Sequence, residues 1–162
     1  MTEILLVRHA MAGNWELPNA ERPLSEQGRK DARKLSCKLA QSGIDTIYSS
    51  PFKRALETVE PLSRETGIQI QIRNDLRESE KNEELPNVRK RMVTALREIV
   101  GENKNRTVVV CTHGGTTWGL ISHFDSAFDH EQYKQIRTPD VRRFVYNEIG
   151  GRYDEDFGIQ DL

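Results

Sequence analysis

The sequence predicts an α/β fold in which helices cover both faces of a mostly parallel central sheet. Strand-like runs alternate with segments of helical periodicity along the 162 residues, and this alternation is typical of three-layer α/β/α sandwiches. Two runs, residues 3–7 and 107–111, are apolar and rich in β-branched residues, as buried strands are. A histidine follows each run, His9 or His113. If these strands are parallel neighbours, the histidines meet at the carboxyl edge of the sheet, where open α/β sheets bind ligands.

The other strands are expected at residues 45–48, 68–72 and 143–147. These runs contain Ile, Val, Tyr or Phe, which favour extended structure. The tail, residues 150–162, is expected to be poorly ordered or docked at an edge of the sheet, and we predict no function for it.

The first two helices are expected over residues 25–41 and 52–66. Ser25 can cap the first helix, and Gly43 follows its end. Apolar residues recur at helical spacing in both segments, and Gly67 ends the second. Each helix therefore has an apolar side that can cover the sheet.

A third helix is expected over residues 86–100. A proline lies in its first turn and Gly101 follows its end. The stretch before it, residues 77–87, is the most charged part of the chain and is expected to be a solvated loop that forms a short cap. Another helix is expected to start near Gly114.

Composition limits the classes of function. A chain of 162 residues is long enough for a single domain, residues 1–162, with its own core. Its 24 basic and 25 acidic residues give a net charge of −1, which offers no general reason to expect binding to nucleic acid or membranes. Residues 4–7 form too short an apolar stretch for a signal peptide or a membrane span. Cys37 and Cys111 form no disulfide framework, which fits the reducing cytoplasm.

The residues after the two strands suggest chemistry on a phosphate group. Cleavage of a phosphate ester by a histidine needs a neutral imidazole, cations for the phosphoryl oxygens and an acid for the leaving oxygen. His9 can supply the imidazole, and the Arg8 guanidinium can donate two hydrogen bonds to an oxyanion. His113 adds a second imidazole, and Gly114 allows the backbone and a helix N-terminus to approach the anion. A single histidine at a strand end is more often structural, so none of these residues is decisive alone.

A third segment adds a further cation. Residues 47–58 run from a strand end through a Ser-Ser-Pro turn into a helix, and Arg54 in its first turn can reach back over the sheet edge. With this segment the chain resembles the histidine phosphatase superfamily, in the branch that includes the phosphoglycerate mutases. The matching motifs occur in the family's order and span nearly the whole chain: Leu6-Val7-Arg8-His9, Pro23 to Gly28, Ser49-Ser50-Pro51 with Arg54, Ala55 and Thr58, Leu76-Arg77-Glu78, and Val110 to Gly115.

The resemblance implies a phosphoglycerate mutase-like fold and a role for each matching residue. His9 would be the nucleophile that is transiently phosphorylated, and Arg8, Arg54 and His113 would complete the phosphate pocket. Glu78 matches the position where many members keep a proton donor. The reaction would be phosphoryl transfer to His9 and then hydrolysis by water, with no metal and no cofactor, because arginines and imidazoles supply the positive charge. Three glutamates in the same charged loop are alternatives for the acid: Glu80, Glu83 and Glu84.

Departures from the family pattern bear on the reaction. Ala10 stands where the family usually has glycine, and a backbone angle that only glycine tolerates would be strained there. Asn14 is shifted by one position from an asparagine of mutase-like members, so it can contact phosphate or cap a loop. The 77–87 segment is short compared with the lid-like insertion of those members. An open pocket favours hydrolysis over the mutase reaction, so we expect a phosphomonoester phosphatase.

Two other functions stay open from the sequence. A phosphohistidine phosphatase that acts on a phosphoprotein fits the Arg-His-Ala start, although such proteins tend to lack the separate acid that Glu78 provides. A module that binds a phosphate ligand without catalysis is the other. The expected partner is a small phosphorylated metabolite or a phosphoprotein, and the sequence specifies neither the substrate nor the oligomeric state.

Three more residues could contribute to a site. His123 and His130, seven residues apart, could lie on one helix face and bind a metal, but surface or helix-end positions are more usual without a cluster of ligands. Trp118 could line the mouth of the pocket, and we expect it at the edge of the core.

Overall fold

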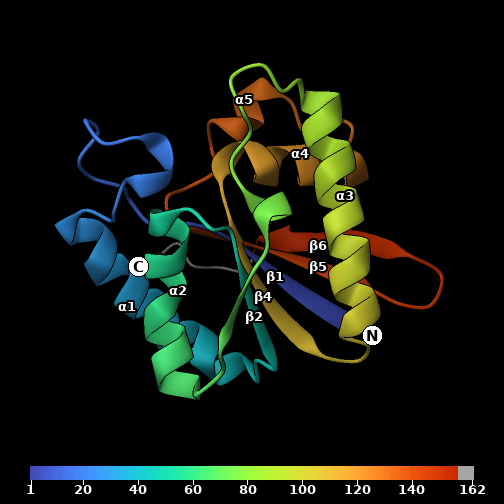
Figure 1. The fold of residues 1–162 in the computed structure, drawn as a ribbon. Coiled ribbons are helices and arrows are strands. Elements are labelled where there is room, and N and C mark those ends of the chain that lie inside the picture. The colour runs from blue at the N-terminus through green and yellow to red at the C-terminus, as the bar shows by residue number, and fades with distance from the viewer. Residues whose placement is uncertain (157–162) are drawn as a thin grey trace.

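The computed structural model describes residues 1–156, which form a six-stranded sheet with helices on both faces (Figure 1). The order across the sheet is β3-β2-β4-β1-β5-β6. β1, β2, β3 and β4 pair in parallel, whereas β5 and β6 are antiparallel to their neighbours. The sheet is therefore mostly parallel, as predicted. The strands are β1 (Thr2–Arg8), β2 (Thr46–Ser49), β3 (Ile70–Ile72), β4 (Thr107–Thr112), β5 (Asp140–Tyr146) and β6 (Gly151–Asp156).

Two pairs of helices bury opposite faces of this sheet. α1 and α2 lie on one face and α3 and α4 on the other (Figure 1). Successive strand residues point to opposite faces, so Leu5 and Val7 pack in the core with α1 and α2, while Ile4 and Leu6 pack in the core with α3 and α4. This confirms the three-layer prediction. The helices are α1 (Glu26–Leu39), α2 (Lys53–Thr66), α3 (Leu85–Glu102), α4 (Gly114–Phe124) and the short α5 (His130–Tyr133), with 3-10 turns η1 (Asn19–Glu21), η2 (Ala40–Ser42) and η3 (Asn74–Leu76).

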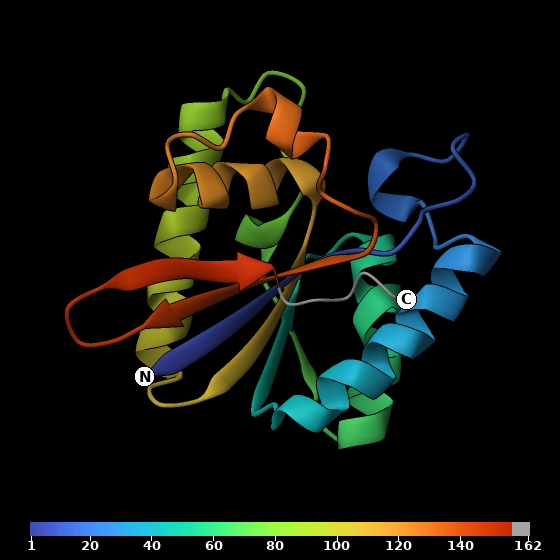
Figure 2. The same cartoon turned by 180° about the vertical axis from the view of Figure 1, so that it is seen from behind.

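The five predicted strands are present. A sixth strand, β6, lies in the segment for which no strand was predicted. β5 begins at Asp140, before the predicted 143–147, because its whole length pairs antiparallel with β1. β6 returns beside β5 as a hairpin at the edge of the sheet (Figure 2). Edge docking of the tail is thus confirmed for residues 151–156, and residues 157–162 lie outside the described part of the chain.

Local capping explains where the helices begin and end. The Ser25 hydroxyl accepts a hydrogen bond from the Gly28 amide (3.0 Å) and caps α1, as predicted. α3 continues through Gly101, where the sequence predicted its end. The Asn103 side chain donates to the Ile99 carbonyl (2.7 Å), so an asparagine rather than the glycine closes this helix.

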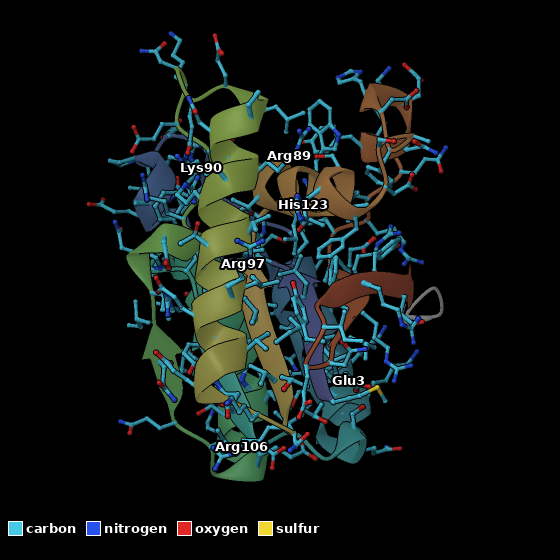
Figure 3. The ribbon with its side chains drawn as sticks, turned by 90° about the vertical axis from the view of Figure 1, so that its right-hand side faces the viewer. Glu3, Arg89, Lys90, Arg97, Arg106 and His123 are labelled. Atoms are coloured by element: carbon cyan, nitrogen blue, oxygen red, sulfur yellow. The ribbon has the colours of Figure 1, made fainter. Side chains whose placement is uncertain are left out.

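A polar contact joins α3 to α4 on the face opposite α1 and α2. Arg89 points from α3 toward α4 (Figure 3), where its Nε donates to Ser122 Oγ (3.1 Å). Lys90 and Arg97 on the same helix are exposed. Within residues 1–156, no helix has the length and apolar character needed to cross a membrane.

Candidate active site

The histidines after β1 and β4 meet at the carboxyl edge of the sheet. β1 and β4 are adjacent and parallel, in a register that places Arg8 beside Thr112. The His9 amide donates to the Thr112 carbonyl (3.1 Å), and the ring centroids of His9 and His113 are 5.2 Å apart. Both histidines are buried. The pairing predicted from the two strand motifs is confirmed.

His9 is a neutral imidazole held in one tautomer. Its Nδ1 lies 2.6 Å from the Ala10 carbonyl, so Nδ1 carries the hydrogen and donates it. The lone pair of Nε2 accepts a hydrogen bond from Arg54 Nε (3.2 Å). Burial, with the nearby charges of Arg54 and Arg8, lowers the pKa of His9 to about 4. Nε2 is therefore unprotonated at neutral pH, with its lone pair held by the hydrogen bond from Arg54.

Ala10 replaces the glycine that usually follows the Arg-His pair, and a glycine-specific backbone angle would strain it. The residue is buried, and its amide donates to Thr58 Oγ1 (3.0 Å). Among the residues described, Asn14 and Asn105 are the non-glycine residues with positive φ. Ala10 is thus not in the left-handed region, and the methyl group causes no backbone strain here.

His113 links the end of β4 to α4. Its Nε2 lies 2.8 Å from Ser50 Oγ, and its amide donates to Thr116 Oγ1 (3.0 Å) in the first turn of the helix. Burial, followed by the charges of His9 and Arg54, holds the pKa of His113 well below its usual value. α4 begins at Gly114, as the sequence predicted.

Two guanidiniums lie beside the histidines. Arg8 Nη1 donates to the Ile136 carbonyl (2.9 Å), and Arg54 Nη1 donates to the Asn19 carbonyl (2.6 Å). The Arg8 guanidinium lies directly over Gly114, because a Cβ at that residue would be 2.9 Å from Arg8 Cζ. Gly114 therefore makes room for an arginine side chain, in addition to any approach of its backbone to an anion.

Two polar atoms of this cluster lack a partner. Among the described residues, Arg8 Nε and His113 Nδ1 are buried without any hydrogen bond. Buried polar groups in folded proteins are nearly always hydrogen-bonded, so such exceptions call for an explanation. Two unpaired nitrogen atoms beside Arg54 fit a site that binds an anion.

Glu78 reaches the same edge from the segment between η3 and α3. Its Oε1 accepts a hydrogen bond from the Ser79 amide (2.8 Å), and a Cβ on Gly115 would lie 2.8 Å from that oxygen. The carboxylate thus lies against the first turn of α4. Burial lowers the pKa of Arg54, and the negative charge of Glu78 opposes this shift, so the two side chains are electrostatically coupled.

The other glutamates of this loop are engaged elsewhere. Glu83 forms a two-pronged ion pair with Arg91 (2.9 Å from Nε to Oε1 and 2.8 Å from Nη2 to Oε2), and this hydrogen bonding lowers the pKa of Glu83. Glu80 and Glu84 are exposed. The geometry therefore favours Glu78 among the candidates for the acid.

Asn14 is in a turn of the loop before η1. The residue is exposed, has a φ of 52°, and accepts a hydrogen bond on its carbonyl from the Leu17 amide (3.2 Å). Asparagine tolerates this left-handed conformation better than most residues. No hydrogen bond within residues 1–156 joins its side chain to the histidines or arginines, so contact with phosphate stays a prediction.

The structure does not support a shared helix face for His123 and His130. His123 lies in the last turn of α4 and His130 begins α5, and both are exposed. Residues 1–156 hold no group of three His, Cys, Asp or Glu side chains arranged for a metal ion. Trp118 is partly buried, as expected for the edge of the core.

Sequence reasoning missed two residues that support the cluster. Ser50, which bonds to His113, lies in the recognised Ser-Ser-Pro turn but received no role of its own. Arg91 donates to the backbone carbonyls of Asp75 (2.7 Å) and Arg77 (2.9 Å), and so ties the segment with Glu78 to α3. Its position three residues after the buried Val88 was a usable signal, because it places an arginine beside the apolar stripe of a helix.

The family model described as histidine phosphatase superfamily (branch 1) matches residues 4–83 and 78–152. The chain belongs to the histidine phosphatase superfamily. Two curated relatives match parts of this histidine phosphatase chain. An 8-oxo-(d)GTP phosphatase of Mycolicibacterium smegmatis is 33% identical over 121 residues, which cover 73% of the chain and 36% of the relative. Phosphoserine phosphatase 1 of Hydrogenobacter thermophilus is 32% identical over 75 residues, which cover 43% and 35%. The chain thus matches about a third of the length of each relative.

Solved structures of similar size share the fold. A crystal structure of a mutant phosphoserine phosphatase from Entamoeba histolytica, in complex with phosphoserine, has a TM-score of 0.83 at 16% identity and full coverage of both chains. Bacillus stearothermophilus YhfR has a TM-score of 0.82 at 21% identity, with 96% of each chain covered. These likenesses confirm the predicted architecture.

Proposed function

We propose that this histidine phosphatase family member hydrolyses phosphate monoesters through a transient phosphohistidine on His9. The state of His9 carries the proposal, because its buried neutral ring directs the Nε2 lone pair toward the Arg54 guanidinium. A nucleophile of this kind needs an unprotonated nitrogen and cations nearby for the phosphoryl oxygens, and attack requires that Arg54 shift its hydrogen bond from Nε2 to the phosphate. The names of the two relatives, both phosphatases, support the same class of reaction.

In the first step, His9 Nε2 attacks the phosphorus atom. An N–P bond forms, the P–O bond to the leaving group breaks in line with it, and the leaving oxygen takes a proton from the Glu78 carboxyl. Arg8, Arg54 and His113 hold the non-bridging oxygens and stabilise the charge on them in the transition state. In this complex the phosphate supplies partners for the unpaired atoms of Arg8 and His113.

In the second step, water attacks the phosphorus of the phosphohistidine. The Glu78 carboxylate takes a proton from the water, the N–P bond breaks, and inorganic phosphate leaves with neutral His9 restored. The Arg8 and Arg54 guanidiniums supply the positive charge in both steps, and His113 adds a hydrogen bond, so we propose that no metal ion takes part. Treatment with a chelator is expected to leave the rate unchanged.

We propose that residues 77–87 form a short cap over the site of a single domain. A short cap leaves the pocket open to water, which favours hydrolysis of the phosphohistidine over return of the phosphoryl group to a bound product. The substrate class is small phosphorylated metabolites, for which the relatives offer two chemistries, a nucleotide and phosphoserine. Cys37 and Cys111 are both free, which supports a reducing, cytoplasmic setting.

A hydrolysis screen tests this proposal. The protein is assayed against phosphomonoesters and a phosphohistidine protein, with the His9→Ala variant as the blank. We expect the protein to release phosphate from monoesters and the His9→Ala variant to release none. Faster hydrolysis of the phosphohistidine protein would favour a phosphoprotein substrate, and activity equal to the blank on every substrate would contradict the proposal.

A further inference from the structure

The start of α3, α4 and α5 come together at one end of the molecule (Figure 1). Residues of these three helices, with Ser79 and Glu83 from the loop that contains Glu78, line a small cavity. Its volume is about 180 Å³. Trp118, His130 and Tyr133 supply aromatic walls, and Leu85 and Val88 add apolar surface from the start of α3. None of these side chains belongs to the cluster of histidines and arginines, so the cavity has no role in holding phosphate.

The cavity adjoins Glu78, the residue proposed to protonate the leaving group. Ser79 and Gly115 both line it. The Ser79 amide donates to Glu78 Oε1, and a Cβ on Gly115 would lie 2.8 Å from the same oxygen. Glu78 thus contacts two residues of the cavity lining and interacts electrostatically with Arg54 of the phosphate cluster. If Glu78 protonates the ester oxygen, a group attached to that oxygen has the cavity as its neighbour.

The aromatic wall is preformed. The rings of Trp118 and Tyr133 are stacked with centroids 4.9 Å apart, and His130 meets Trp118 edge-on at 5.9 Å. The indole Nε1 donates to the Phe128 carbonyl (3.2 Å), while the Asp129 side chain caps the short helix that carries the other two rings. A wall fixed in this way binds a ligand with little loss of conformational freedom.

Size and charge define what the cavity accepts. An apolar cavity of about 150 Å³ is enough to hold one benzene ring, so this one fits a single ring. No lysine or arginine is among the described residues that line the cavity. Glu83 is the carboxylate among them, and it is already paired with Arg91. A second anionic group on the substrate would lie next to the Glu78 carboxylate, and the described lining offers it no lysine or arginine as a partner.

We infer that this cavity binds the leaving group, and that the preferred substrates are phosphomonoesters whose alcohol carries one uncharged aromatic ring. The inference rests on the proposed function and narrows its substrate class. It also separates this chain from enzymes that prefer phosphoserine or phosphoglycerate, because the carboxylates of those substrates would meet no lysine or arginine among the described residues of the cavity lining.

Paired substrates test the inference. Benzyl phosphate and ethyl phosphate both release a primary alcohol and differ mainly in the ring. We expect kcat/KM for benzyl phosphate to exceed that for ethyl phosphate by about tenfold or more, which is the scale of one added apolar group in a fitting pocket. Phosphoserine should be hydrolysed more slowly than benzyl phosphate. Equal values for the two esters, or a preference for phosphoserine, would overturn the inference.

Substitutions in the aromatic wall test whether it causes the preference for benzyl phosphate. Trp118→Ala should reduce the benzyl-to-ethyl ratio of kcat/KM about tenfold, whereas Trp118→Phe should keep most of it. Trp15→Ala removes an indole from the exposed loop before η1 and should leave the ratio unchanged. If Trp118→Ala fails to fold, Tyr133→Ala makes the same test on the other ring of the stack. A ratio that survives both substitutions would contradict the inference.

Binding without turnover separates this inference from the proposed function. In a Trp15→Phe background, Trp118 is the remaining tryptophan, so its emission reports on the cavity when benzylphosphonate, which cannot be hydrolysed, is added. A change in emission that ethylphosphonate does not cause supports the cavity even if no ester is hydrolysed. Hydrolysis of monoesters with no such change would leave the proposed function standing and reject the cavity.

Discussion

The cluster around His9 and the segment around Glu78 reach the same edge of the sheet in different ways. His9 and His113 follow directly on β1 and β4, are buried, and are fixed by backbone register and by Ser50. Glu78 lies on a partly exposed loop between η3 and α3. Hydrogen bonds from Arg91 to the carbonyls of Asp75 in η3 and Arg77 in the loop tie this segment to α3.

The difference separates binding of phosphate from donation of the proton. Groups on the ends of central strands cannot move without disturbing the core, and Arg54 is buried in the first turn of α2. The nucleophile and the cations are therefore held in place before substrate arrives. An acid on a loop can adjust to leaving groups of different shape. Changes at the strand ends should therefore affect every substrate, and changes in the loop should affect mainly the substrates that need a proton.

Loss of Arg54 should have the largest effect. Arg54→Ala removes a buried guanidinium that bonds to His9 Nε2, and we expect kcat/KM to fall about 10³-fold for alkyl and aryl phosphates alike, as for other groups that stabilise charge in the transition state. Arg54→Lys should restore little, because a single ammonium cannot reproduce the two contacts of the fork. A loss confined to alkyl esters would contradict the division between the two regions.

Loss of the acid should depend on the leaving group. Glu78→Gln keeps the shape of the side chain, and we expect the rate on alkyl phosphates to fall about 10²-fold, the usual scale for general acid catalysis. Aryl phosphates, whose phenolate needs no proton, should keep most of their rate. Glu80→Gln is the matched control in the exposed part of the same loop. No effect of Glu78→Gln on alkyl phosphates would remove Glu78 from the mechanism.

Loosening the loop should resemble a weaker loss of the acid. Arg91→Leu frees the carbonyls of Asp75 and Arg77, and we expect kcat on alkyl phosphates to fall about tenfold, with a smaller change on aryl phosphates, because Glu78 is then poorly positioned. Arg89→Leu, on the same helix but bonded to Ser122, should behave like the unmodified protein. Equal losses on both substrates would mean that Arg91 acts on the strand-end cluster instead.

The free energy of unfolding should decrease as the pH falls from about 6.5 to 4, because His9 is buried and neutral in the folded protein. Folded His9 titrates at a pKa of about 4, below the 6.5 of an exposed histidine, so the unfolded state takes up a proton first as the pH falls below 6.5. The difference in the pKa of His9 between the two states should therefore lower the free energy of unfolding by about 3 kcal/mol between pH 6.5 and 4. Urea denaturation across this range measures the loss, and His9→Gln should make the dependence shallower. An unchanged slope in that variant would contradict a buried neutral His9.

The strand-end cluster could be predicted from the sequence because local patterns determine it. An apolar β-branched run followed by a polar residue identifies a buried strand and its end, and parallel pairing then brings His9 and His113 together. Arg54 followed from its place in the first turn of a helix after a strand. The ends of strands and the starts of helices can be recognised from a few neighbouring residues, and the backbone geometry at those points determines where these side chains lie.

The support for the loop could not be predicted in the same way. The spacing of α3 could have placed Arg91 beside the apolar stripe, but no local pattern identifies its partners, Glu83 and two backbone carbonyls, which belong to other segments. The antiparallel start of β5 at Asp140 and the β6 edge also depend on pairing with β1 rather than on composition. The aromatic cavity arises where three helices meet, which the order of the elements alone does not reveal.

Trapping the covalent intermediate tests the central claim most directly. The protein is mixed with a ³²P-labelled aryl phosphate, quenched in base, and digested to locate the label. The account predicts an acid-labile phosphoryl group on the peptide that contains His9, and no label in His9→Ala protein that is otherwise folded. Turnover of the ester with no labelled histidine, or label that persists in His9→Ala, would contradict it.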